Sequence, residues 1–273
     1  MIISQILWNV SPELFNLGPI SIRWYGLLFA MAFVAGYLIL TWVYKQEGRQ
    51  KSEVEQFTIY VIFGTVIGAR LGHCLFYNPE FYLSNPLEII MIWRGGLASH
   101  GAAIGIVLAL YLYCKKMKDV QLIWLLDRVV IVVALGGSFI RLGNLFNSEI
   151  IGMPTDLSWA FIFTSVDDIP RHPAQLYESI AYFITFLVLF FSYIKKRKSL
   201  GTGFIFGLFL IMVFLSRFFI EIIKENQSDF EAGMLLNMGQ LLSIPFIIAG
   251  VIFITKSFKA SNKKEIKNKE KVT

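Results

Sequence analysis

Long apolar runs, separated by short polar linkers, fill most of the chain. A helix needs about 20 mostly apolar residues to cross the hydrocarbon core of a bilayer. Seven runs reach that length and predict seven transmembrane helices, at residues 19–41, 57–77, 97–114, 122–143, 174–194, 202–222 and 235–255. We therefore expect an all-α polytopic membrane protein, with one domain over residues 1–255 and a basic tail over 256–273.

The composition supports a membrane protein. Of the 273 residues, 56% are hydrophobic and 16% are charged, and the mean hydropathy of +0.62 is too high for a soluble core with a polar surface. The chain begins with "MIISQILWNVSPELF". Because no basic segment precedes an apolar core there, we expect the first long run, rather than a cleavable signal peptide, to direct insertion.

The basic residues alternate between the loops and predict the topology. Lys or Arg stands at three, three and four positions of the linkers 45–51, 115–118 and 195–198 and at seven of the tail, together 17 of the 25 in the chain. Each of the intervening loops, 78–96, 144–173 and 223–234, holds one. The positive-inside rule then places the N-terminus outside and the tail in the cytoplasm. We interpret the net charge of +6 as lipid-surface charge and the tail as disordered, not as nucleic-acid binding.

In this topology, six of the seven helices bring polar side chains to the same, outer leaflet. An ionisable side chain within the bilayer costs roughly 2.5–3.5 kcal/mol, so several together indicate one shared cavity. The residues are Arg23 and Tyr25 in "IRWYG", Arg70 and His73, His100 in "RGGLASHGAAIG", Arg141 and Asn144 in "IRLGNLFNSEIIG", His172, Gln175, Tyr177 and Glu178 in "RHPAQLYES", and Arg217 and Glu221 in "SRFFIEIIKE".

Glycine spacing predicts that two of the helices touch closely. Gly64, Gly68 and Gly72 recur every fourth residue in the second run, and Gly101 and Gly105 share a face of the third. Small residues at this spacing allow helix backbones to approach each other within a membrane.

Structural roles compete with functional ones for several polar residues. Arg23 and Arg94 can extend to the interface by snorkelling. Asp127 and Arg128, at the cytoplasmic start of the fourth run, are typical of an interfacial ion pair.

Two further positions keep both interpretations open. Arg217 and Glu221, four residues apart on one helix face, can pair as structural glue. His100 can pack between helices, although the glycines on either side favour close approach of a ligand.

The residue types indicate a ligand but not a reaction. Arginines with amide donors, inside a membrane, match a phosphodiester head group, because guanidinium forms forked hydrogen bonds to phosphate oxygens. No nucleotide loop, H-E-x-x-H pair or G-x-S-x-G elbow occurs, and the three histidines stand on different helices, so we expect neither metal nor cofactor. Cys74 and Cys114 lie in apolar runs and are interpreted as packing residues.

Two other classes of membrane protein remain as alternatives. A transporter or channel for an anionic lipid or solute predicts polar residues through both leaflets, whereas the inner halves of these helices are apolar. An intramembrane protease needs a catalytic dyad or metal motif at depth, and none is evident.

Five motifs together carry a family resemblance. "IRLGNLFNSEIIG" resembles the signature of the bacterial prolipoprotein diacylglyceryl transferases, and "RWYG", "GGLASHGAAIG", "RHPAQLYES" and "SRFFIE" resemble other motifs of that family in the same order, over residues 18 to 255. Ile140, Leu145 and Val213 depart from the family pattern, which usually has glycine, phenylalanine and tyrosine there. The polar positions are retained, so the departures concern packing rather than chemistry.

The resemblance implies an activity. A diacylglyceryl group would pass from phosphatidylglycerol to the lipobox cysteine thiol of a preprolipoprotein signal peptide, with glycerol phosphate leaving, in the bacterial cytoplasmic (inner) membrane. The family's important positions correspond to Tyr25, His100, Arg141, Asn144, Glu149, Arg217 and Glu221. The nucleophile belongs to the substrate, so neither cysteine of this chain needs to react.

The residues allow roles to be assigned within this activity. A histidine has a suitable ordinary pKa to take the thiol proton, so we expect His100 to be the base. Arg141 and Arg217 would stabilise the departing phosphate, with Tyr25 as a further catalytic residue and Asn144 and Glu221 also binding phosphatidylglycerol. Asn147, Glu149 and Gly152 would fix the turn into an outer loop domain, residues 145–172, in which "SWAFIFTS" predicts a short strand and which is a candidate to dock the peptide.

Overall fold

The computed structural model describes residues 5–18, 20–92, 95–197, 199–225, 231 and 233–269, most of them helical. Arg94, considered above as an interfacial residue, lies outside the described residues. The elements in chain order are β1 (Ile6–Trp8), β2 (Glu13–Leu17), β3 (Ile20–Arg23), α1 (Trp24–Gln46), α2 (Lys51–Phe76), α3 (Pro79–Ser84), α4 (Pro86–Ile90), α5 (Ser99–Lys116), α6 (Leu122–Phe146), β4 (Phe161–Phe163), β5 (Pro170–Arg171), α7 (Ala174–Lys196), α8 (Phe204–Ile220), the 3-10 turn η2 (Glu221–Ile223) and α9 (Met238–Lys269).

Six of these helices are long and apolar enough to cross a membrane: α1, α2, α6, α7, α8 extended by η2, and α9 as far as Ser261. They fit a multi-pass membrane protein, and large apolar side chains such as Leu38, Phe63 and Ile104 are more than 60% exposed, as on a surface that faces lipid. The third apolar run forms α5, whose 18 residues include Ser-His at one end and Lys-Lys at the other. A seventh span stays a prediction.

The start of the first helix was predicted wrongly. The helix begins at Trp24 rather than at residue 19, because residues 20–23 form strand β3, paired antiparallel with β2. Arg23 therefore belongs to a strand, where its guanidinium lies 4.0 Å from the Glu13 carboxylate and its side chain is 63% exposed.

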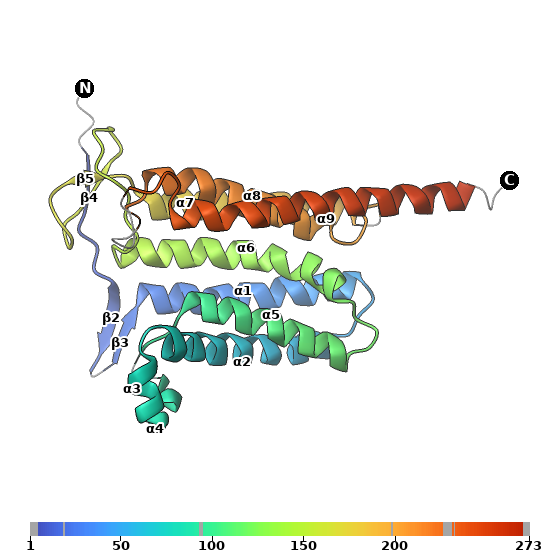
Figure 1. The fold of residues 1–273 in the computed structure, drawn as a ribbon, viewed down its shortest axis with the longest axis horizontal. Helices are drawn as coiled ribbons and strands as arrows, with labels where there is room; N and C mark the ends of the chain where they lie inside the picture. The colour runs from blue at the N-terminus through green and yellow to red at the C-terminus, as the bar shows by residue number, and fades with distance from the viewer. Residues whose placement is uncertain are drawn as a thin grey trace. The chain divides into compact units, whose positions relative to one another are not determined.

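The chain divides into two compact units, and the first contains residues Met1–Ile39 and Leu126–Thr273. In this unit α6 packs between α1 and α7. Gly36 of α1 faces Val132 of α6, and Gly136 of α6 faces Ala32 of α1. On the other side, the Ser138 hydroxyl of α6 lies 2.9 Å from the Ser179 hydroxyl of α7. Helices α7, α8 and α9 continue the series side by side (Figure 1). The order α1, α6, α7, α8, α9 brings the C-terminal end of α6, the N-terminal end of α7 and the C-terminal end of α8 together.

The second unit, residues Leu40–Leu125, is built on α2 and α5. The predicted glycine contact is confirmed, because Gly64, Gly68 and Gly72 lie against the backbone of Gly101 and Gly105. A Cβ atom added at any of these positions would meet backbone atoms of the facing helix, so the seam depends on the absence of side chains.

A small β-structure covers the helix ends of the first unit. β4 lies within the segment predicted as a strand, which confirms that prediction, and it pairs with β5 antiparallel and with the N-terminal β1 in parallel. Beneath it, Leu145, Ile151, Phe161 and Phe163 form an apolar cluster against which Trp8 packs, and the Trp8 indole N–H donates to the Leu145 carbonyl at 3.1 Å.

Polar contacts at the other end of the first unit close the helix bundle. Asp127 accepts hydrogen bonds from the backbone N–H groups of Gly203 (2.7 Å) and Phe206 (2.8 Å), so a carboxylate of α6 caps the start of α8. The expected pairing of Asp127 with Arg128 is also present, at 3.8 Å. The basic segment from residue 256 lies within α9 as far as Lys269, so a disordered tail that begins at residue 256 stays a prediction.

Candidate functional site

Arg141 and Asn144 lie on one face of the last two turns of α6. The Arg141 Nη1 group donates to the Asn144 side-chain oxygen at 3.1 Å, and the Asn144 amide donates to the Glu149 carboxylate, also at 3.1 Å. Asn144 is buried, whereas Glu149 is exposed at the rim. The Asn144 amide thus accepts from the Arg141 guanidinium and donates to the Glu149 carboxylate. It lies between these two charged groups and links them by hydrogen bonds.

The turn that follows α6 is strained. Ser148 and Ile150 have φ angles of 53° and 58°, in the left-handed region that costs L-residues roughly 1–2 kcal/mol. Contacts on Glu149 hold this conformation: its carboxylate accepts from Asn147 at 3.1 Å, and its carbonyl accepts from the Gln175 amide at 2.5 Å. The role of Asn147 and Glu149 in shaping the turn stays a prediction.

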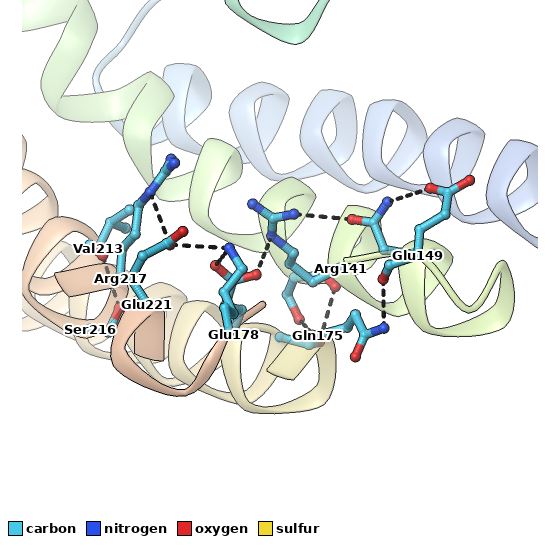
Figure 2. Close-up of polar contacts among 12 residues, drawn as sticks. Arg141, Glu149, Gln175, Glu178, Val213, Ser216, Arg217 and Glu221 are labelled. Atoms are coloured by element: carbon cyan, nitrogen blue, oxygen red, sulfur yellow. Dashed lines mark hydrogen bonds and ion pairs between the residues drawn. The ribbon is translucent and has the colours of Figure 1, made fainter. Parts of the chain in front are cut away.

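A row of alternating charges extends from Arg141 across α7 to the end of α8. We call Arg141, Glu178, Lys224, Glu221 and Arg217 the charged row. Figure 2 shows Arg141, Glu178, Glu221 and Arg217 side by side in this order. The distances between neighbouring charged atoms are 2.8 Å for Arg141 Nε to Glu178 Oε2, 3.5 Å for Glu178 Oε1 to Lys224 Nζ, 3.1 Å for Lys224 Nζ to Glu221 Oε2, and 3.8 Å for Glu221 Oε2 to Arg217 Nε.

Burial differs along the charged row. The side chains of Glu178, Lys224 and Glu221 are 0%, 3% and 6% exposed, whereas those of Arg141 and Arg217 are 17% and 33% exposed. The predicted pairing of Arg217 with Glu221 is confirmed, although the long distance leaves the Arg217 Nε group without a hydrogen bond. Lys224 therefore pairs with both buried carboxylates, while the two terminal guanidiniums are partly exposed and can reach a ligand.

Gly152 anchors the backbone that carries Lys224. The two residues form an antiparallel bridge, supported by a 2.8 Å bond from the Met153 N–H to the Ile223 carbonyl. A Cβ atom at Gly152 would lie 2.5 Å from that of His172 and 2.9 Å from the Ile223 carbonyl oxygen. Only glycine fits between these two segments.

Tyr25, at the start of α1, joins this site. Its ring lies directly over Gly143 of α6, where an added Cβ atom would be 2.7 Å from Cδ2. The Tyr25 hydroxyl is coupled electrostatically to Glu149 and to Arg141. The structure therefore brings together Tyr25, Arg141, Asn144, Glu149, Arg217 and Glu221 of the predicted residues, all in the first unit.

His100 belongs to the second unit. It is exposed at the first turn of α5, with its ring 5.6 Å from that of Phe76 and 5.8 Å from that of Tyr77. Arg70, in the same unit, is buried and donates to the backbone carbonyls of Glu88 and Ile89 in α4 and of Gly95 and Gly96 in the loop before α5, so it ties that loop to α4. The role of His100 as the base stays a prediction.

Arg171 and His172, in the loop before α7, make polar contacts beside the site. Arg171 donates to Asp167 at 2.6 Å and to Glu225, and the hydrogen bond from Arg171 lowers the pKa of the Asp167 carboxyl. Partial burial lowers the pKa of His172, which favours the neutral imidazole next to the Tyr177 hydroxyl, 3.5 Å away. Among the described residues, no group of three His, Cys, Asp or Glu side chains is placed to hold a metal ion.

Comparison with known proteins identifies the family. The family model for prolipoprotein diacylglyceryl transferase matches residues 12–256. Similar relatives, each named phosphatidylglycerol--prolipoprotein diacylglyceryl transferase, come from Chloroherpeton thalassium (50% identity over 94% of this chain and 96% of the relative), Tolumonas auensis (48%, over 93% and 98%) and Bacteroides fragilis (48%, over 96% and 98%). The chain belongs to the prolipoprotein diacylglyceryl transferase family.

In this member of the family, the sequence motifs did not reveal the centre of the charged row. Lys224 was counted only as one of the sparse loop charges, and Glu178 only as one of several polar groups at the start of a helix. Tyr182, one turn beyond Glu178, interacts with Arg141 and was also missed. The available signal was the spacing of Arg217, Glu221 and Lys224, which places all three on adjacent turns.

Proposed function

We propose that this chain transfers the diacylglyceryl group of phosphatidylglycerol to the lipobox cysteine of a preprolipoprotein signal peptide. The observation that carries the proposal is the pair of partly exposed guanidiniums, Arg141 and Arg217, at the two ends of a buried charged row in a member of this family. The substrates are those that the names of the relatives state.

The proposed reaction is a displacement at a glycerol carbon. The substrate thiol loses its proton, its sulfur forms a bond to the diacylglyceryl carbon, and the bond between that carbon and the phosphate oxygen breaks. The electron pair of that bond leaves with glycerol phosphate. A thiol with an ordinary pKa near 8.5 is mostly protonated at pH 7, so a base accelerates the first step, and His100 is the residue proposed for it.

The charged row is suited to stabilise the leaving group. Negative charge grows on the phosphate oxygen as the carbon–oxygen bond breaks, and donors that are already in place stabilise that charge without reorganisation. Arg141 and Arg217 are proposed as these donors, with Asn144 and Glu221 fixing their orientation and Tyr25 closing the side next to Gly143.

A seven-span topology completes the proposal. With α5 as the third span, the N-terminus would lie outside, the C-terminus in the cytoplasm and the charged row near the outer leaflet of the bacterial cytoplasmic membrane. Support comes from the basic linkers and from the common end of the first unit at which α6 ends and α7 begins. The 145–172 loop would then face the outside, where the peptide substrate is presented.

The test is reconstituted transfer. Purified protein in mixed micelles that contain phosphatidylglycerol would receive a fluorescent lipobox peptide, and mass spectrometry would detect the thioether product together with released glycerol phosphate. A matched peptide with serine in place of the lipobox cysteine should stay unmodified. Lack of transfer to the cysteine peptide by folded protein would overturn the proposed function.

A further inference from the structure

Lys224 occupies the centre of the charged row and contacts neither arginine. Its ammonium lies between the carboxylates of Glu178 and Glu221, and its side chain is 3% exposed. A buried lysine keeps its charge only where anionic partners compensate for lost hydration, and here two carboxylates do so. Each carboxylate in turn faces one arginine, so the ammonium links the two halves of the row.

The charges of the row do not cancel. Three cations and two carboxylates leave one net positive charge, and Glu149, beyond Asn144, is exposed and screened by solvent. A phosphodiester carries one negative charge. The row therefore matches a monoanionic phosphodiester such as the head group of phosphatidylglycerol, since binding it would bring the buried charges to balance.

We infer that Lys224 and Glu178 are positioning residues that keep both arginines open to the phosphodiester; the inference rests on the proposed function. Without the ammonium, Glu178 and Glu221 would each pair with one guanidinium, and the row would become neutral and closed. Without the Glu178 carboxylate, Arg141 would lose its 2.8 Å contact while the row gained positive charge. The two losses therefore have opposite effects on phosphodiester binding.

Steady-state kinetics in micelles of varied phosphatidylglycerol content separate these effects. For Lys224→Met we expect the apparent KM for phosphatidylglycerol to rise at least about tenfold, because uniform electrostatic binding is lost. For Glu178→Gln we expect KM not to rise and kcat to fall at least about tenfold, because Arg141 is no longer held in place. A merely structural role would reduce the active fraction of both variants and leave KM unchanged in both.

Two variants that keep the net charge of the row provide the matched controls. The variant with both Glu178→Gln and Lys224→Met keeps one net positive charge, as does Lys224→Arg, so KM in both should stay within about threefold of the parent value. These two variants carry the test if Lys224→Met alone does not fold, since removal of one partner from a buried charge pair is strongly destabilising. Folding is checked by gel filtration and thermal unfolding in detergent.

The outcomes are distinct. A rise of KM in Lys224→Met without a rise in Glu178→Gln, together with recovery of KM in the double variant, supports the inference. KM changes of the same sign in both single variants, or a parent-like KM in Lys224→Met, overturn it, as does a KM outside the threefold range in the two control variants. Absence of transfer by the parent protein itself would instead overturn the proposed function.

Discussion

Replacement of Arg141 by lysine separates the geometry of a guanidinium from its charge. An arginine side chain has five N–H donors and a lysine has three. In the structure one side of Arg141 faces Glu178 at 2.8 Å, one N–H donates to Asn144 at 3.1 Å, and Tyr182 takes a third interaction. Even if each of these partners takes one N–H group, at least two of the five donors remain, which is enough for one forked contact to two phosphate oxygens.

A lysine at this position would use all its donors on the same three partners. The enzyme would lose two charge-assisted hydrogen bonds to the departing phosphate, each worth about 1.5–3 kcal/mol. The transition state would be destabilised by about 3–6 kcal/mol, which corresponds to a fall in kcat/KM of roughly 10² to 10⁴. Net charge is unchanged, so the loss would report on the fork alone.

The assay measures peptide lipidation by Arg141→Lys protein at several phosphatidylglycerol contents. The control is an arginine-to-lysine substitution at a position far from the charged row. Arg197→Lys is the control, because Arg197 follows the opposite end of α7 from Glu178 and lies 5.8 Å from the Tyr193 ring. We expect it to keep kcat/KM within about twofold. If folded Arg141→Lys protein stayed within about fivefold of the parent, the donor count would be wrong and charge alone would explain the role of Arg141.

Three further predictions address the nucleophile, the base and the backbone. Protein with Cys74→Ser and Cys114→Ser should keep its transferase rate, and a folded double variant without turnover would exclude a mechanism based only on the substrate thiol. His100→Gln should lower turnover at pH 7 by about 10² to 10⁴, with partial recovery at higher pH as the substrate thiolate fraction grows; near-normal turnover at pH 6.5 would remove His100 as the base. Gly152→Ala should lower the free energy of unfolding by about 1–3 kcal/mol through overpacking and should reduce activity. Gly26→Ala is the control, because nothing lies within 4 Å of the added atom, and it should change neither stability nor activity. Thermal unfolding and transfer assays measure the two effects.

Sequence patterns with a local cause were predicted well. Apolar runs of sufficient length gave helices, the glycine repeat gave a close helix contact, and the segment "SWAFIFTS" gave strand β4. The pairing of Arg217 with Glu221 follows from a spacing of one helical turn. In each case the information lies within one element or in a repeated spacing, so it can be read without knowledge of the tertiary structure.

Features that depend on distant segments were not predicted. The pairing of β1 with β4 joins residues about 155 positions apart, so nothing near residue 6 indicates a strand partner. Lys224 is the one basic residue of the sequence 223–234, and only the packing of α7 against α8 brings Glu178 next to it. The strained angles at Ser148 and Ile150 were also missed, because residues other than glycine rarely adopt them.

The carboxylate of Asp127 has a consequence for how the protein is assembled during synthesis. The start of a helix has N–H groups without intrahelical partners, and hydrocarbon offers no water to replace them. Asp127 of α6 supplies two of these bonds to α8, and Asp127 leaves the ribosome 76 residues before Gly203 does. The carboxylate that caps α8 is therefore already synthesised when α8 is inserted, so the start of this helix finds a partner for its free N–H groups at once.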